Sequence, residues 1–408
     1  MQWSSRAMLR LLIVNILDRE DNNMAEWRRI KVADIGNVVT GKTPKTNNCD
    51  YYGGKMPFLT PSDDMSVKYV RDTKKHLTEA GKMSVKNAVI PENSICVSCI
   101  GSDLGKVVIT TEETVTNQQI NSIIVNGSQF DINYIYYSMV ELGKILNFHS
   151  KTSTAVPIVN KSSFSQYEIS CPDLYIQRKI GDVLSKLDEK IEENIKINNN
   201  LEQQAQSIYQ QMFIDNPDSN WETGTLSDIA DITMGQSPSG SSYNEDKEGT
   251  IFFQGRAEFG FRFPTVRLFT TEPKRMACAN DTLMSVRAPV GDLNVAHTDC
   301  CIGRGLAAIH SKTNHQSFVL YTMFSLKKQL DVFNGEGTVF GSINRNSLNE
   351  MPILIPSEEK LDEFERIVAP MDTAIRNNYD EICRLEQIRD SLLPKLMSGE
   401  LDVSGIDI

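Results

Sequence analysis

The sequence lacks the residue sets that most enzyme and metal-site classes require. Its eight cysteines are scattered, and neither they nor the five histidines occur at the spacing of metal ligands. It offers no Ser-His-Asp or Cys-His set for nucleophilic catalysis, and it has no Asn/Asp-Pro-Pro-aromatic tetrad of the kind used by amino-methyltransferases. These absences predict a protein without a catalytic site, a metal or a bound cofactor of its own. Cys96 and Cys99, which lie in an apolar run, are expected to be buried strand thiols.

Long hydrophobic runs are also missing. The apolar stretch 8–17 is interrupted by Arg10 and Asn15, is too short to cross a bilayer, and is not followed by a signal-peptide cleavage site. We therefore expect a cytoplasmic protein without a membrane segment, in which residues 1–23 form an extension. Unpatterned cysteines are typical of such a reducing compartment.

An excess of basic charge is absent as well. The net charge is −11, which argues against strong binding of DNA by charge alone. The acidic residues are concentrated near the C-terminus, where 361–408 contains 11 acidic and 5 basic residues. By contrast, 24–176 contains 16 basic and 15 acidic residues, so local basic clusters remain compatible with a nucleic-acid partner.

What the sequence does contain is a long internal repeat. Each copy begins with a Trp-x4-Val/Leu-x-Asp-Ile motif, at Trp27 and Trp221, which is followed by a Gly-x-Thr/Ser-Pro turn. The offset between the copies is 194 here, 186 in the middle, and 184 at the end of each copy, as for Asn160 and Asn344. Because the offset falls in steps, the copies share one frame and differ by loop deletions. The sequence therefore predicts two copies of a whole domain plus its connector.

Each copy consists of a globular part rich in short strands, followed by a long helix. This mixture predicts an α/β fold class with globular domains at 24–176 and 216–360 and helices at 177–215 and 361–408. Strands are predicted at 87–100, 107–111, 120–125, 250–253, 282–286 and 306–310, and shorter helices at 131–146 and 316–330.

Both long helices have the pattern of a coiled-coil seam, in which apolar residues recur at alternating spacings of three and four. Because only two such helices occur, we expect them to pair with each other, and a twofold relation between the copies predicts an antiparallel pair. Asn194 and Asn378 are equivalent under the offset of 184. We predict that they meet near the middle of the pair and set its register; the alternative is that both face solvent.

The segment Gly36-Asn-Val-Val-Thr-Gly-Lys-Thr43 matches the phosphate-loop pattern of nucleoside triphosphatases. That chemistry requires a strand before the loop and a helix after it, whereas Pro44 and turn-forming residues follow here. The second copy keeps neither the first glycine nor the lysine. We interpret the segment as a structural turn and keep a nucleotide-binding enzyme that uses Gly36–Thr43 as an alternative.

Three motifs together resemble the specificity subunits of type I restriction–modification systems. They are the repeated opening motif, the run Gln177-x2-Ile180 that begins a long helix, and the closing run 385–401; the resemblance covers about 24–404. It implies two target recognition domains, one for each half of a bipartite, gapped site in double-stranded DNA. They would be joined by an antiparallel coiled coil and related by a pseudo-twofold axis.

The resemblance also implies a non-catalytic subunit that docks two methyltransferase subunits and the restriction subunits. S-adenosylmethionine, ATP and Mg²⁺ would then belong to those partners. A coiled-coil scaffold without a DNA function remains a further alternative.

Candidate DNA contacts are the polar and aromatic residues of predicted loops, because Arg, Lys, Asn and Gln read base edges in the major groove. Arg256 and Arg262, which flank aromatic residues, are the leading candidates. An ordinary surface role is the alternative at each position. The candidates are Lys42, Thr43, Lys45, Thr46, Asn47, Tyr51, Tyr52, Lys151, Thr152 and Ser153 in the first copy, and Gln236, Ser237, Tyr243, Gln254, Arg256, Arg262, Arg287 and Arg304 in the second.

Overall fold

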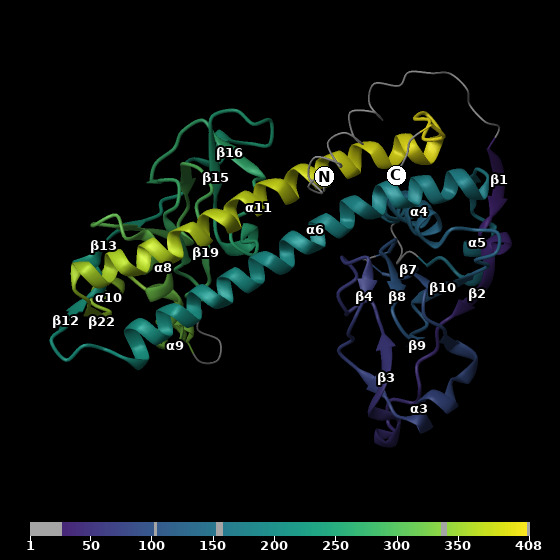
Figure 1. The fold of residues 1–408 in the computed structure, drawn as a ribbon, viewed down its shortest axis with the longest axis horizontal. Helices are drawn as coiled ribbons and strands as arrows, with labels where there is room; N and C mark the ends of the chain where they lie inside the picture. The colour runs from purple at the N-terminus through teal and green to yellow at the C-terminus, as the bar shows by residue number, and fades with distance from the viewer. Residues whose placement is uncertain (1–26, 102–103, 152–157, 336–340, 406–408) are drawn as a thin grey trace, which may run out of the picture. The chain divides into compact units, whose positions relative to one another are not determined.

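A computed structural model of the chain describes residues 27–101, 104–151, 158–335 and 341–405. The chain forms two compact units, Met1–Glu193 with Glu381–Ile408, and Asn194–Asp380. The division passes through both long helices, α6 (Leu174–Tyr209) and α11 (Glu358–Ser398), so each unit contains a globular domain and part of each helix (Figure 1). Within the described residues, no helix is both long enough and apolar enough to cross a membrane.

The globular domain of the first unit contains sheets of order β2-β10-β7-β8-β4 and β5-β3-β9-β6, and a separate pair β1-β11. Helix α4 packs on β7 and β8, and its buried residues share one core with the N-terminal part of α6 (Figure 1). The strands are β1 (Arg28–Lys31), β2 (Gly36–Thr40), β3 (Tyr52–Leu59), β4 (Tyr69–Val70), β5 (His76–Leu77), β6 (Val89–Ile90), β7 (Ile95–Ser98), β8 (Val107–Thr110), β9 (Thr114–Thr116), β10 (Ile120–Val125) and β11 (Glu168–Cys171). The helices are α2 (Val32–Ile35), η1 (Cys49–Tyr51), α3 (Glu79–Ser84), η2 (Lys86–Ala88), α4 (Ile132–Lys151) and α5 (Lys161–Gln166).

The second unit contains sheets of order β13-β21-β18-β19 and β14-β16-β15-β20-β17, and a separate pair β12-β22. The strands are β12 (Glu222–Thr225), β13 (Ala230–Met234), β14 (Tyr243–Asn244), β15 (Thr250–Phe253), β16 (Leu268–Thr270), β17 (Met276–Ala277), β18 (Thr282–Ser285), β19 (Leu293–Val295), β20 (Cys300–Ile302), β21 (Leu306–Ser311) and β22 (Pro352–Ile355). The helices are η3 (Gln210–Asp215), α7 (Leu226–Ile229), η4 (Gly240–Ser242), η5 (Arg256–Glu258), α8 (Gln316–Ser325), α9 (Lys327–Asp331), η6 (Val332–Asn334) and α10 (Arg345–Asn349).

The repeat in the sequence is a repeat of strand topology. Strand β10 pairs antiparallel with β2 and β7, as β21 does with β13 and β18. The parallel pair β3-β9 corresponds to β15-β20, and the outlying pair β1-β11 corresponds to β12-β22. The predicted fold class, two similar α/β domains with long connecting helices, is confirmed.

Several residues that recur in both copies are helix caps. The Asp34 carboxylate accepts from Lys31 N at 2.9 Å at the start of α2, and Asp228 accepts from Thr225 N at 2.7 Å at the start of α7. Asn160 and Asn344 likewise cap α5 and α10 by accepting a backbone N–H at 2.9 Å. These side chains satisfy N–H groups that a helix start leaves without a partner, which explains why the same residue types recur.

The predicted strand 87–100 is divided in the structure into β6 and β7. Pro91 follows β6, and Asn93 has a left-handed φ of 62°, which interrupts the extended conformation. Cys96 and Cys99 are buried as predicted, and burial raises the pKa of Cys96 to about 12 and that of Cys99 to about 11. Both are therefore neutral thiols that pack in the core.

The two long helices pair antiparallel within each unit. In the first unit Lys179 Nζ donates to Ser404 O at 3.0 Å, and Arg389 Nη1 donates to Asp188 Oδ1 at 2.9 Å. The N-terminal half of α6 thus lies beside the C-terminal part of α11 and the residues that follow it. In the second unit Phe213 contacts Phe364 with ring centres 5.2 Å apart.

The buried asparagines of the seam differ in part from the predicted pair. Asn378 Nδ2 donates to Asn198 Oδ1 at 2.9 Å, and Asn198 Nδ2 donates to Ile375 O at 3.3 Å. Asn198 lies one turn beyond Asn194 on the same face of α6. Asn194 is 1% exposed, so it belongs to the seam, and its part in the register stays a prediction.

Lys68 is a half-buried cation between the first-unit sheet and the helices that cover it. Its ammonium group donates to Ser185 Oγ at 2.8 Å and lies 4.7 Å from the centre of the Tyr137 ring. Burial lowers the pKa of Lys68 to about 8, although Asp188 and Glu189 oppose this shift. The folded protein therefore releases this proton more easily than the unfolded chain, in which the lysine keeps its ordinary pKa of 10.5.

This shift predicts a pH-dependent contribution of Lys68 to stability. Below about pH 8 the folded state carries the full cost of burying the charge, and that cost disappears as the pH rises towards the ordinary lysine pKa. The free energy of unfolding of the parent, relative to that of Lys68→Met, should rise by roughly 1–3 kcal/mol between about pH 7 and about pH 10. Urea unfolding of both proteins at both pH values measures the difference, and a constant difference would contradict the assignment.

Candidate nucleic-acid interface

The Gly-x-Ser-Pro turn of the second unit is tied to the loop between β20 and β21. Gly235 N donates to Leu306 O at 2.9 Å, Gln236 N donates to Ile302 O at 3.0 Å, and Arg304 N donates to Ser237 Oγ at 3.2 Å. A Cβ atom on Gly235 would lie 2.1 Å from the backbone oxygen of Gly303. Only glycine therefore allows the two segments to approach this closely.

The first unit repeats this arrangement between the turn after β2 and the loop between β9 and β10. Lys42 N donates to Thr116 O at 2.8 Å, and the Thr43 hydroxyl donates to the Gln118 side-chain oxygen. A Cβ atom on Gly41 would lie 2.1 Å from Asn117 O. Gln118 corresponds to Arg304 under the offset of 186, so the same two loop positions meet the turn in both units.

Two of the predicted tyrosines hold these turns in place. The Tyr52 hydroxyl donates to Pro44 O at 2.9 Å, and the Tyr243 hydroxyl donates to Pro238 O at 3.1 Å. Tyr243 is also stacked on Phe252, with ring centres 4.8 Å apart. The hydroxyl groups are therefore used inside the fold, and each fixes the proline end of its turn.

Two further loops of the second unit join the turn. Gly303 N donates to Phe253 O at 2.8 Å, Gly305 N donates to Gln254 O at 3.3 Å, and Val286 N donates to Gly305 O at 2.9 Å. The turn and these loops bring five exposed polar or basic side chains together. We call them the second-unit turn cluster: Gln236, Gln254, Arg256, Arg287 and Arg304.

Among the described residues, one arginine of this cluster forms an ion pair, that of Arg256 with the Asp292 carboxylate. The cluster therefore presents donors for hydrogen bonds together with a positive charge. These are the groups that read guanine and adenine edges and neutralise phosphates in a DNA duplex.

The prediction that Arg262 contacts a DNA groove is wrong. Its side chain is 3% exposed and forms ion pairs with Glu202 at 3.0 Å and with Asp372 at 3.1 Å. These acidic residues lie on α6 and α11, so Arg262 points into the second unit. Neighbouring Phe261 is exposed instead, which reverses the usual pattern for an arginine beside aromatic residues.

The other predicted residues of the first unit are distributed over several segments. Lys45, Thr46 and Asn47 are exposed in the segment that follows the turn, and Tyr51 is half-buried in η1. Thr152 and Ser153 lie outside the described residues. Gln118 was missed because its loop carries no arginine or lysine, although the repeat offset pairs it with Arg304. We call Lys42, Thr43 and Gln118 the first-unit turn cluster.

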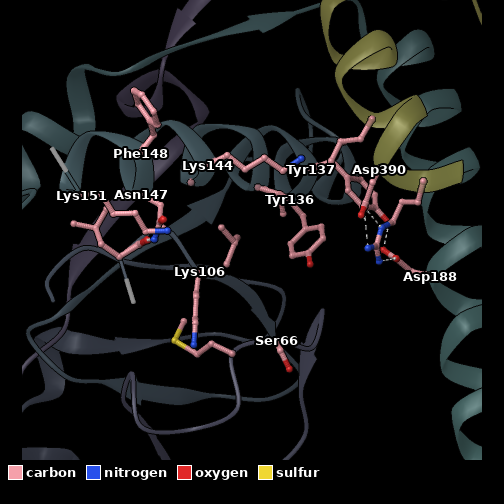
Figure 2. Close-up of a pocket in the computed structure, with 18 residues that line it drawn as sticks. Ser66, Lys106, Tyr136, Tyr137, Lys144, Asn147, Phe148, Lys151, Asp188 and Asp390 are labelled. Carbon is pink, nitrogen blue, oxygen red and sulfur yellow. Dashed lines mark hydrogen bonds and ion pairs between the residues drawn. The ribbon is translucent and has the colours of Figure 1, made fainter. Parts of the chain in front are cut away.

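Lys151 belongs to a different part of the first unit. It lines an open cavity of about 650 Å³ together with Lys106, Lys144 and Asn147. Figure 2 shows Asn147 and Lys151 at one end of the cavity and Asp188 at the other, and the Lys144 side chain extends towards Tyr136 and Tyr137.

The alternative of a phosphate loop at Gly36–Thr43 is excluded by the local structure. Gly36–Thr40 is strand β2, and the residues after Thr43 form a turn in place of the helix that must receive the phosphates. In the described part of the chain no group of three or more His, Cys, Asp or Glu side chains is arranged to hold a metal ion.

The comparison with protein families agrees with this geometry. The family model of the type I restriction modification DNA specificity domain matches residues 24–203 and again 218–387. The chain belongs to this family. Each match spans a globular domain together with a long helix, so the repeated unit is one specificity domain with its connector. The predictions of this family and of a non-catalytic DNA-recognition subunit are confirmed.

Known relatives match over most of the chain or over a part of it. The putative type I restriction enzyme MjaX specificity subunit of Methanocaldococcus jannaschii is 26% identical over 408 residues, which cover 93% of this chain and 94% of that protein. The type I restriction enzyme HindI specificity subunit of Haemophilus influenzae is 34% identical over 166 residues, covering 39% of this chain and 36% of that protein. The crystal structure of a type I restriction-modification S subunit from M. genitalium has the same fold, with a TM-score of 0.61, 15% identity and coverage of 93% and 98%.

Proposed function

We propose that the chain reads a bipartite DNA site, with one half-site bound by each specificity domain through its turn cluster. The observation that carries this proposal is the pairing of the Gly-x-Thr/Ser-Pro turn with Gln118 in one unit and with Arg304 in the other. A surface built twice in the same way, but with different side chains, suits the reading of two different half-sites. Lys42, Thr43, Gln236 and Gln254 supply further contacts to bases or phosphates.

The chain itself carries out no chemistry in this proposal. Two methyltransferase subunits bring S-adenosylmethionine and methylate one base in each half-site, and restriction subunits bring ATP and Mg²⁺. Acidic outer faces of the long helices supply their docking surface. The specificity domains determine only where on the DNA this machinery acts.

The test is methylation sequencing of genomic DNA from cells with and without this chain. Loss of one gapped, two-part methylation motif on removal of the chain is the expected result, and it identifies both half-sites. Persistence of every motif, in cells shown to express the methyltransferase partner, would contradict the proposal and favour a scaffold without a DNA function.

Arg304→Ala should weaken recognition of one half-site only. The Arg304 backbone N–H still donates to Ser237 after the substitution, so the loop keeps its position. If the guanidinium forms a bidentate contact with a base, its loss lowers the affinity by roughly 1–3 kcal/mol. Binding of the assembled complex to duplexes that carry either half-site alone measures this effect.

Arg345→Ala is the matched control, because Arg345 is an exposed arginine of the same unit on α10 and is not one of the side chains of the turn cluster. It should leave both half-sites unchanged. Equal losses in the two variants would indicate a general effect of positive charge and would contradict base reading by Arg304.

A further inference from the structure

One polar contact in the first unit has no role in the surface described above. The Tyr137 hydroxyl of α4 donates to the Asp188 carboxylate of α6, and Lys68 Nζ lies 3.3 Å from the same hydroxyl. The three side chains join the sheet, the covering helix and a long helix. Tyr137 is 2% exposed and the Asp188 side chain 15%, so the contact is largely buried.

The same contact occurs in the second unit. The Tyr321 hydroxyl of α8 donates to Asp372 Oδ1 of α11 at 2.9 Å, and Arg262 Nη2 donates to the Tyr321 oxygen at 3.2 Å. The tyrosine and aspartate positions differ between units by 184 and the basic positions by 194, which are the offsets of the repeat. We call these sets docking triads: Lys68–Tyr137–Asp188 and Arg262–Tyr321–Asp372.

The basic residue of each triad is held by an equivalent backbone bond. Ile109 N on β8 donates to Lys68 O at 2.7 Å, and Val295 N on β19 donates to Arg262 O at 2.8 Å. Both basic residues therefore stand at the same edge of their sheet. Both positions hold a positively charged hydrogen-bond donor, although it is a lysine in one unit and an arginine in the other.

Each triad also involves the second long helix of its unit. Arg389 of α11 donates to Asp188 at 2.9 Å, and Glu202 of α6 lies 3.0 Å from Arg262. Figure 2 shows Asp188 and Asp390, which both pair with Arg389, at the helix side of the first-unit cavity.

Open space borders both triads. A cavity of about 650 Å³ touches Tyr137 and Asp188, and one of about 340 Å³ touches Arg262 and Asp372. At these places the sheet and the helices are not held together by close packing alone. Directional bonds between the triad side chains therefore determine how the two surfaces approach each other.

We propose that the docking triads position each recognition sheet on its part of the helix pair, and thereby help to set the distance between half-sites that the protein accepts. The inference rests on the proposed function. Its residues are positioning residues, because they lie inside the units and touch no base.

A contribution to stability alone does not explain the triads. Replacing a buried charged set by apolar residues of the same volume often leaves a fold equally or more stable, because the charges must first be removed from water. What such a set provides is one preferred geometry, since each donor and acceptor accepts a partner only in a narrow range of directions. Its presence at the same place in both units fits a role in orientation.

The experiment uses the full chain assembled with its methyltransferase partner. Methylation rates are measured on duplexes that carry both half-sites at the native spacing, or at one base pair more or fewer. The double variant Tyr137→Phe/Tyr321→Phe removes only the two hydroxyl groups. We expect it to lower the preference for the native spacing by about tenfold, which corresponds to the loss of a hydrogen bond to a charged group.

The matched control is Tyr134→Phe, compared with the single variant Tyr137→Phe. Tyr134 is on the same helix as Tyr137 and donates to Ser170 O on β11 at 2.7 Å, which is a bond inside the globular domain. Both tyrosines are buried, so loss of either hydroxyl should lower the unfolding midpoint by a similar amount. The control should keep the spacing preference of the parent.

A second comparison tests the basic position. Lys68→Arg, which copies the second unit, should keep the spacing preference, whereas Lys68→Met should reduce it. An unchanged preference in the tyrosine double variant, or an equal reduction in the control, overturns the proposal. If the parent itself shows no preference for a two-part site, the proposed function fails instead.

Discussion

We expect Gly235→Ala to destabilise the second unit by about 3 kcal/mol and to abolish recognition of its half-site. The new Cβ atom would lie 2.1 Å from Gly303 O and 2.8 Å from Leu306 O. Neither oxygen can move freely, because Leu306 begins the paired strand β21 and Gly303 N is bonded to Phe253 O. The turn must therefore shift away from the loop that carries Arg304. Urea unfolding and half-site methylation measure the two effects.

Gly240→Ala is the control for this substitution, because no atom lies within 4 Å of a Cβ atom at Gly240. It should leave both measurements close to those of the parent. Gly41→Ala should repeat the effect in the first unit, where the Cβ atom would lie 2.1 Å from Asn117 O. Parent-like behaviour of Gly235→Ala would mean that the turn is not packed as closely as the structure indicates.

Much of the architecture could be predicted because it depends on local patterns. The heptad spacing predicted both long helices, and the repeat offsets predicted two domains of one topology. The cap residues Asp34 and Asn160 recur because a helix start needs the same acceptor in each copy. Such features involve residues close in the sequence, so a single chain is sufficient to reveal them.

The sequence-based predictions that fail concern contacts between segments that are distant in the sequence. Arg262 is buried because Glu202 and Asp372 meet it from two other elements. Its sequence neighbours, aromatic on both sides, give no sign of those partners. The repeat offset pairs Gln118 with Arg304, but residues 117–119 carry no charge that would mark this loop as a DNA contact.

The register of the helix pair illustrates the same limit. A heptad pattern determines which residues face the seam, and both Asn194 and Asn198 do. It does not determine how far one helix slides along the other. In the structure Asn378 donates to Asn198, one turn from the position expected by symmetry.

Arg262→Met should destabilise the second unit by about 3–5 kcal/mol. Methionine fills a similar volume, but it leaves the Asp372 and Glu202 carboxylates without the cation between them. Removing one partner of a buried ion pair is more harmful than replacing the whole set by apolar residues. Urea unfolding measures the loss. Arg345→Met, at an exposed position of the same unit, should change stability little.

The loss of stability caused by Arg262→Met should also depend on pH. The buried carboxylates determine whether this loss grows or shrinks as the pH falls. Burial raises the pKa of Glu202, and Arg262 opposes this shift. Without the guanidinium, the carboxylate takes up a proton at a higher pH than in the parent, which removes the unpaired charge. The difference in unfolding free energy between parent and Arg262→Met should therefore narrow as the pH falls from about 8 to about 5. A constant difference would mean that the packing of Arg262, and not its charge, holds the sheet on the helices.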